Sequence, residues 1–210
     1  FPLNSFLAGA DVYKGQVQDL ALREANGTAL GDGDRPDHFR KGQLVQHRKT
    51  PFTTQVEVQG EPFTYLDSRG NGHLIDISHR FSMGSYLVTQ ELYEEVAGEH
   101  RSRDRGASLP VSAVTWLEAT AFCNELSKHA GLPLVYEISG GEVRVSPGVP
   151  GYRLPMEDEW TFACTNGASA ASAWTSKDAK PDGLTRPVDK GVADDLGFHD
   201  LLGNVWEWCN

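Results

Sequence analysis

The chain has 210 residues, with 29 Asp and Glu against 19 Lys and Arg, and its formal net charge is −10. Because phosphate backbones are bound by clustered Lys and Arg, this charge excludes nucleic acid as the main partner. No apolar run reaches about 18 residues, so we expect no membrane span, and the length fits one large domain or one domain with an N-terminal appendage.

The three cysteines are Cys123, Cys164 and Cys209. They lie far apart, show no metal-ligand spacing, and their odd number leaves at least one thiol free in a monomer. We expect buried, reduced thiols, and the cellular compartment stays open. The start at Phe1 lacks a methionine and a signal pattern, so we expect it to be processed or trimmed.

We divide the chain after residue 72. Residues 1–72 are predicted to form a β-rich N-terminal extension that packs on the main domain, residues 73–210. Two charged segments of the extension, Gly31–Asp37 and His47–Lys49, are interpreted as solvated turns. The first is no calcium loop, because Pro36 stands where such a loop would offer a ligand.

Periodicity and capping residues predict the elements in chain order. Alternation and turn glycines predict strands at Thr53–Val58, Phe63–Leu66, His73–Ile77, Leu134–Ile138 and Glu142–Val145, the last two as a hairpin. Apolar residues three and four apart predict helices at Gln90–Ala97, Trp116–Ala130 and Met156–Cys164. Thr89 caps the first helix, and Thr115 and Glu118 form a capping box for the second. Residues 168–195 predict a long surface loop, and the whole indicates a mixed α+β domain.

The segment Asp200–Asn210 carries the densest signal. In a strand, Trp206 and Trp208 would share one face and Glu207 would point the other way. Glu207 is then either a surface carboxylate or a metal ligand. The Gly203-Asn204 turn can aim backbone carbonyls inward, and hard oxygen ligands of this mixed kind suit calcium.

Four ordered blocks resemble the formylglycine-generating enzyme (sulfatase-modifying factor) family. Residues Phe81–Tyr93 are similar to its F-x-M/I-G-x-Y-x-V-T-x-x-x-Y opening, and Pro110–Cys123 to its P-V-x-x-V-S/T-W block. Residues Tyr152–Trp160 resemble its Y-R-L-P-T-E-A-E-W block. Pro187-Val188 and then Gly197–Trp208 resemble its P-V and G-L-Y-D-M-x-G-N-V-W-E-W ending.

The resemblance implies an α+β fold of the C-type lectin-like kind, rich in irregular loops. It implies a calcium site with carboxylate ligands from Asp200 and Glu207 and backbone carbonyl ligands from Gly203 and Val205. Four signature tryptophans are expected in the structural core: Trp116, Trp160, Trp206 and Trp208. The family's other calcium site is not carried over, because the loop between Asn166 and Pro187 is short and divergent here.

The departures bear on activity. Met156 replaces a Thr that would cap the third predicted helix, so that cap is expected to be weakened or replaced. His199 stands in Phe198-His199, which replaces a Leu-Tyr pair, and is expected to be structural. Asp194-Asp195 replaces a Pro-Asn pair. The oxidases of the family bind copper through two cysteines downstream of the W-E-W, and none of the three cysteines matches those positions, so no catalytic residue is assigned.

Three functions stay open. The first is a non-catalytic protein that displays a C-terminal surface, diversified in the manner of the variable proteins of diversity-generating retroelements, to a protein or other macromolecular ligand. The second is a formylglycine-generating oxidase that converts a sulfatase cysteine to an aldehyde, and only this function requires copper. The third is an accessory module. We favour the first, and we expect the domain to continue beyond Asn210, because later strands would pair with the W-E-W segment.

Overall fold

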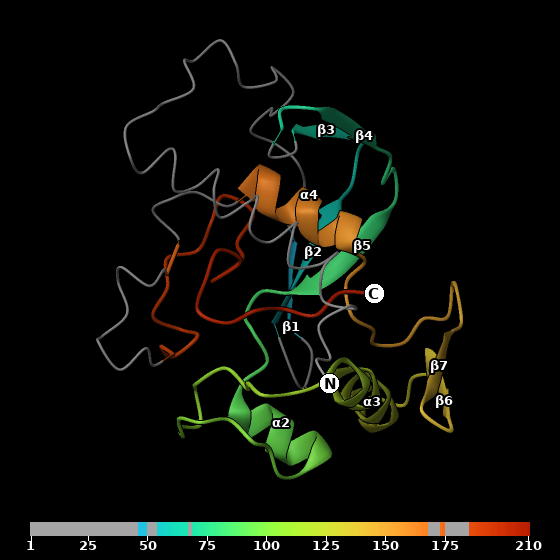
Figure 1. Ribbon diagram of the computed structural model, residues 1–210, viewed down its shortest axis with the longest axis vertical. Coiled ribbons are helices and arrows are strands. Elements are labelled where there is room, and N and C mark those ends of the chain that lie inside the picture. Colours follow the sequence, from blue (N-terminus) through green and yellow to red (C-terminus); the bar gives the residue numbers. More distant parts are fainter. Residues whose placement is uncertain (1–45, 50–53, 67–68, 168–172, 175–184) are drawn as a thin grey trace.

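In the computed structural model, the described part of the chain comprises residues 46–49, 54–66, 69–167, 173–174 and 185–210. Short antiparallel sheets and separate helices alternate irregularly (Figure 1), which confirms the predicted α+β class. The described elements are β1 Gln46–Lys49, β2 Thr54–Gln59, β3 Phe63–Leu66, β4 Gly72–Ile75, β5 Arg80–Gly84, α2 Gln90–Ala97, α3 Trp116–His129, β6 Tyr136–Ser139, β7 Glu142–Val145 and α4 Glu157–Gly167. The segment Gly31–Asp37 and most of the predicted 168–195 loop lie outside the described residues.

The largest described sheet has three antiparallel strands in the order β1-β2-β5. Val56 and Val58 of β2 alternate with more exposed residues and are fully buried, and Val58 lies opposite Phe81 of β5. The prediction of a solvated turn at His47–Lys49 is wrong, because these residues belong to β1 and pair with β2. Pairing with a neighbouring strand defines β1, and its own basic sequence carries no apolar alternation that would reveal it.

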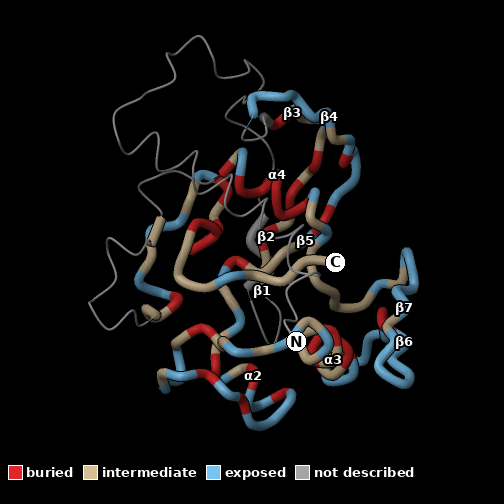
Figure 2. The backbone as a smooth tube through the Cα atoms, in the orientation of Figure 1, coloured by how far each residue is buried: buried red, intermediate tan, exposed pale blue. Residues whose placement is uncertain are grey.

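Helix α4 packs on this sheet and forms the main core with it (Figure 1). Its buried Trp160, Phe162 and Ala163 cluster with Val56, Val58 and Phe81. The ring of Phe63 stands edge-on to that of Phe162, with 5.3 Å between centroids. Residues 185–210, the C-terminal segment, also contribute to this core, through Leu196, Phe198, Leu201 and Leu202. The burial colours in Figure 2 show the buried face running along α4.

Helices α2 and α3 enclose a second core. Tyr93 and Val96 of α2 pack against Phe122 and Leu126 of α3, and the Tyr93 and Phe122 rings stack at 5.2 Å. Both predicted caps are confirmed: the Thr89 side chain accepts from the Leu92 N–H, and Thr115 and Glu118 form the reciprocal capping box. Nothing in the described helices is both long and apolar enough to cross a membrane.

Helix α4, the third predicted helix, begins at Glu157. Met156, which precedes it, has no side-chain oxygen that could cap the helix, as the sequence predicts. Glu159, in the third helical position, accepts a hydrogen bond from the Met156 backbone N–H at 2.8 Å. This is one of the two hydrogen bonds of a capping box; the other would need a capping side chain at position 156. The Glu159 carboxylate also accepts from both Arg153 guanidinium nitrogens at 2.7 Å. The cap is therefore replaced by a buried ion pair.

Of the two hairpins, β3–β4 lies at the top of the view in Figure 1 and β6–β7 at the lower right. β3 pairs with β4, and β6 pairs with β7 across Gly140 and Gly141, whose φ angles of 59° and 86° meet the requirement of a tight hairpin turn. Because β1 and β2 precede residue 72 and β5 follows it, the main sheet draws on both sides of the predicted boundary. The division itself stays a prediction.

Candidate functional site

The C-terminal segment, residues 185–210, contains all four of the predicted calcium ligands. Asp200 is fully buried and adopts a φ of 60°, in the left-handed region. Its Oδ1 accepts hydrogen bonds from Arg186, from Nε at 3.1 Å and also from Nη2, and its Oδ2 accepts from Asn204 Nδ2 at 3.0 Å. Both oxygens of the carboxylate are therefore engaged by side chains of the same segment.

The Gly203-Asn204 turn is fixed by its neighbour Trp174. The Asn204 N–H donates to the Trp174 carbonyl at 3.0 Å, and the Trp174 N–H donates to the Leu202 carbonyl at 2.9 Å. Gly203 has a φ of 113°, and a Cβ at this position would collide with the Trp174 carbonyl oxygen. Only glycine fits here, both for its conformation and for the close backbone approach.

The W-E-W residues do not form the predicted strand. In the described structure residues 206–210 are irregular, so the period-two expectation fails: Trp206 is 60% exposed, whereas Trp208 is half-buried. The prediction that Trp206 lies in the core is therefore wrong. Trp160 is buried, as predicted, and its Nε1 donates to Glu207 Oε1 at 3.1 Å.

The half-buried tryptophans hold the C-terminus in place. Trp208 Nε1 donates to the Val114 carbonyl at 2.8 Å, and Trp116 Nε1 donates to the Cys209 carbonyl at 2.9 Å. Both bonds tie residues 208–209 to the start of α3. Trp116 and Trp208 thus act through their N–H groups at the edge of the core, and neither is fully enclosed in it.

The four predicted calcium ligands do not fit a calcium ion as they stand. Calcium takes six to eight oxygen ligands and gains most from free carboxylates. Asp200 is already neutralised by Arg186, and Asn204 turns an N–H₂ donor toward it. Among the described residues no cluster of three or more His, Cys, Asp or Glu side chains has metal-binding geometry. The calcium site thus stays an untested prediction that the donor set does not favour.

The sequence reasoning missed Arg186 and Tyr86. Arg186 lies 14 residues before Asp200, and no spacing rule connects an arginine in a loop to such a carboxylate. Tyr86 stacks on His199, with ring centroids 4.4 Å apart, and His199 Nδ1 lies 3.0 Å from the Gly191 carbonyl. These contacts agree with the structural role expected for His199, and they place an aromatic pair at the surface, since Tyr86 is 37% exposed.

Asp194 is a buried carboxyl group of this segment with a raised pKa. Its Oδ1 accepts from the backbone N–H groups of Leu196 and Phe198, both at 2.9 Å, while Oδ2 is buried and has no hydrogen-bond partner among the described residues. Burial raises the pKa of Asp194 to about 6, against the lowering effect of those hydrogen bonds. An unpartnered, desolvated oxygen favours the protonated acid.

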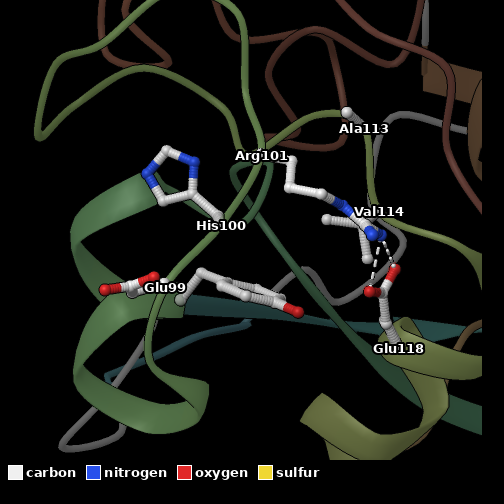
Figure 3. Close-up of a pocket in the computed structure, with 7 residues that line it drawn as sticks. Glu99, His100, Arg101, Ala113, Val114 and Glu118 are labelled. Atoms are coloured by element: carbon white, nitrogen blue, oxygen red, sulfur yellow. Dashed lines mark hydrogen bonds and ion pairs between the residues drawn. The ribbon is translucent and has the colours of Figure 1, made fainter.

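A cavity of about 240 Å³ lies between the end of α2 and the start of α3 (Figure 3). Across one side, Arg101 Nη2 contacts both Glu118 oxygens, at 2.6 and 2.7 Å. The His100 side chain is buried, with Nε2 3.1 Å from the Glu94 carboxylate. The cavity is lined by Tyr93, Glu99, His100, Arg101, Ala113, Val114 and Glu118. Within this lining Arg101 and Glu118 pair with each other, and the lining contains no thiol.

Cys123, Cys164 and Cys209 are reduced thiols, as the sequence predicts. The first two are buried, as expected, whereas Cys209 is only half-buried. Burial raises the pKa of the Cys123 thiol to about 12, so it is protonated and unreactive near neutral pH. Cys123 and Cys164 are therefore core residues.

Comparisons with known proteins agree with this fold. A family model described as the sulfatase-modifying factor enzyme 1-like domain matches residues 41–210. "Chaperone protein LppX" of Paenibacillus barcinonensis is 28% identical over 196 residues, which cover 73% of this chain and 70% of that protein. The "Formylglycine-generating enzyme" of Mycobacterium tuberculosis is 28% identical over 120 residues, which cover 47% of this chain and only 40% of that protein.

Among solved structures, "Treponema denticola variable protein 1" superposes with a TM-score of 0.61 at 23% identity, covering 80% of this chain and 77% of that one. The predicted fold, of the C-type lectin-like kind found in formylglycine-generating enzymes, is thereby confirmed. At this identity the likeness extends to the fold alone.

Proposed function

Since the chain belongs to the sulfatase-modifying factor enzyme 1-like family, we propose that it is a non-catalytic member that binds a protein ligand on the surface of its C-terminal segment. The observation that carries this proposal is Trp206, a 60% exposed tryptophan between fixed neighbours. Exposed tryptophan and tyrosine side chains on a rigid support are typical of the residues that dominate protein–protein binding energy.

The support beneath Trp206 is rigid on both sides. Before it, the Asn204 side chain bonds the backbone N–H and carbonyl of Arg186, both at 3.0 Å. After it, Glu207 accepts from Trp160 and Trp208 donates to Val114. A preorganised surface loses little entropy on binding, which favours affinity without a deep pocket.

The described thiols have structural positions: the Cys123 thiol is held protonated by burial, and Cys164 is enclosed in the main core. A protein ligand is favoured over a small molecule because the described cavity is small and the Arg101–Glu118 ion pair closes one side of it. One relative is named a chaperone, and the structural neighbour is named a variable protein.

The binding half of the proposal is tested by quantitative affinity capture on immobilised protein from an extract of the source organism. Trp206→Ala should weaken retention of the specific ligand roughly 10–30-fold, as expected for a binding hot spot. The matched control is Leu74→Ala, which removes an even more exposed apolar side chain (77% exposed) from β4 and should change nothing. Equal retention by both variants would contradict the proposed surface.

The non-catalytic half is tested separately. The protein, loaded with copper under oxygen, is incubated with a sulfatase-derived cysteine peptide, and the aldehyde is trapped with a hydrazide and detected by mass spectrometry. We expect no aldehyde above the copper-only control. Turnover by the protein would instead establish the oxidase alternative.

A further inference from the structure

Arg186 is built into the loop that the calcium prediction addresses. Its side chain is only 16% exposed, and it donates from two nitrogens of the guanidinium to one oxygen of the fully buried Asp200. Such charge-assisted bonds to a buried carboxylate are the stronger kind of hydrogen bond. The pair thus supplies Asp200 with the positive charge that any buried carboxylate needs.

The guanidinium is confined on several sides. It lies over the Trp174 ring, with Cζ 4.7 Å from the ring centroid, an arrangement that adds cation–π attraction. At Gly191 a Cβ would collide with both Arg186 Nη2 and Asp200 Oδ1, so the glycine leaves room for the pair. The side chain therefore occupies a shaped position and is not a surface arginine that happens to swing inward.

The backbone of Arg186 is fixed to the same turn. Asn204 accepts from the Arg186 N–H through Oδ1 and donates to the Arg186 carbonyl through Nδ2, each at 3.0 Å, while the same Nδ2 contacts Asp200. Arginine, asparagine and aspartate thus form one closed network in which both carboxylate oxygens of Asp200 and both polar atoms of the Asn204 amide are paired. Insertion of a divalent cation would place it against the guanidinium and the amide N–H₂, and both would repel it.

We propose that Arg186 is the resident cation of the C-terminal loop, taking the place that calcium would hold, so that the loop keeps its shape without metal. The network explains why Asp200 and Asn204 both adopt left-handed φ angles near 60°: in this conformation their side chains reach Arg186. The Asp200 carboxylate therefore binds a guanidinium group, which the chain itself supplies through Arg186.

Thermal unfolding with excess EDTA and with millimolar calcium tests this proposal on the unmutated protein. The melting temperature should be the same in both, and terbium, a luminescent calcium substitute, should show no tryptophan-sensitised signal. A melting temperature that falls in EDTA and recovers with calcium would overturn the proposal.

The variant Arg186→Met keeps the length of the side chain and removes its charge. It should lower the melting temperature by roughly 6–20 °C, because it leaves the Asp200 carboxylate buried without a positive charge beside it. Arg186→Lys should recover only part of this loss, since an ammonium cannot donate from two nitrogens in one plane or stack as well on Trp174. An unchanged melting temperature in Arg186→Met would contradict the proposal.

A second variant keeps the test decisive if Arg186→Met does not fold. In Arg186→Met/Asp200→Asn both charges are gone, so this double variant should fold and should melt at a higher temperature than Arg186→Met alone. A double variant that is no more stable than Arg186→Met would show that the two side chains do not act as a charge pair, which would also overturn the proposal.

Discussion

Trp160 and Trp206 occupy the same family signature in very different surroundings. Trp160 is 4% exposed and packs among the residues of the main core, whereas Trp206 is 60% exposed. The energetic role of a tryptophan follows from the apolar area that it removes from water, so the two should differ greatly in their effect on stability. Substitution of Trp160 should therefore affect mainly stability, and substitution of Trp206 should affect mainly ligand binding.

We expect Trp160→Ala to lower the free energy of unfolding by about 3–5 kcal/mol, because it leaves a large cavity in the main core. Trp206→Ala should lower it by less than about 1 kcal/mol, as is usual for exposed positions. Urea unfolding followed by circular dichroism measures both. A loss for Trp206→Ala as large as that for Trp160→Ala would show that this ring is buried in solution.

Asp194 makes stability depend on pH. Its pKa is raised by burial to about 6, above the value near 3.8 of the unfolded chain, so the folded state binds the proton more tightly. Its contribution is therefore fully present below about pH 4 and is lost as the pH rises through 6, by roughly 2–3 kcal/mol.

The measurement is urea unfolding at pH 4.5 and pH 7 for the unmutated protein and for Asp194→Asn, which cannot ionise. The stability difference between the two pH values should shrink in this variant. Asp189→Asn, at an exposed carboxylate, is the control and should leave the difference unchanged. An identical pH dependence in Asp194→Asn would contradict the assignment.

At the scale of elements, the start of α4 shows how a helix begins without a capping side chain. Burial by itself would raise the pKa of Glu159, but hydrogen bonds from Arg153, the Met156 N–H and His79 bring it below the usual range. The carboxylate is thus ionised and serves the helix, the Arg153 segment and the His79 loop together. Loss of this one side chain should disturb all three.

We predict that Glu159→Ala costs about 3–5 kcal/mol of stability, because it leaves Arg153 without its buried partner. Arg101→Ala breaks the exposed Arg101–Glu118 pair and spares the Thr115 capping box, so it should cost about 1 kcal/mol or less. Both are measured by urea unfolding. Equal costs would mean that burial of the Glu159 pair has no energetic weight.

At the scale of the whole molecule, the C-terminal residues join the two cores. Residues 208 and 209 bond to the start of α3, while Asn210 bonds to the residues before α4. The Asn210 side chain accepts from Tyr136 Oη at 2.9 Å and donates to the Leu154 carbonyl at 3.0 Å. Through this segment, helices that belong to different clusters are linked into one unit.

Asn210→Ala should therefore lower stability by about 1–3 kcal/mol, the cost of leaving buried polar partners unpaired. The loss should appear in a single cooperative transition, with fluorescence and circular dichroism coincident. Two separated transitions in the unmutated protein would show instead that the α2–α3 core unfolds independently.

Sequence reasoning succeeded where the signal is local. The capping residues Thr89, Thr115 and Glu118 act within one turn, and the hairpin at Gly140-Gly141 needs only the conformational freedom of glycine. It failed where the partner is distant in the sequence. Strand β1 forms because it pairs with β2, and the role of Arg186 depends on its bond to Asp200, 14 residues later. The W-E-W residues alternate like a strand, yet separate hydrogen bonds direct the Trp208 side chain to Val114 and the Glu207 side chain to Trp160.

The close contact between Gly203 and Trp174 has a consequence for how this surface can evolve. No side chain larger than hydrogen is compatible with position 203, and Asn204 is committed to the Arg186 backbone, whereas exposed Trp206 lies only two residues farther along. Position 203 therefore tolerates no substitution, whereas position 206, three residues later, should tolerate many. The side chain at position 206 can therefore vary during evolution, while Gly203 and Asn204 keep the backbone that carries it in the same place.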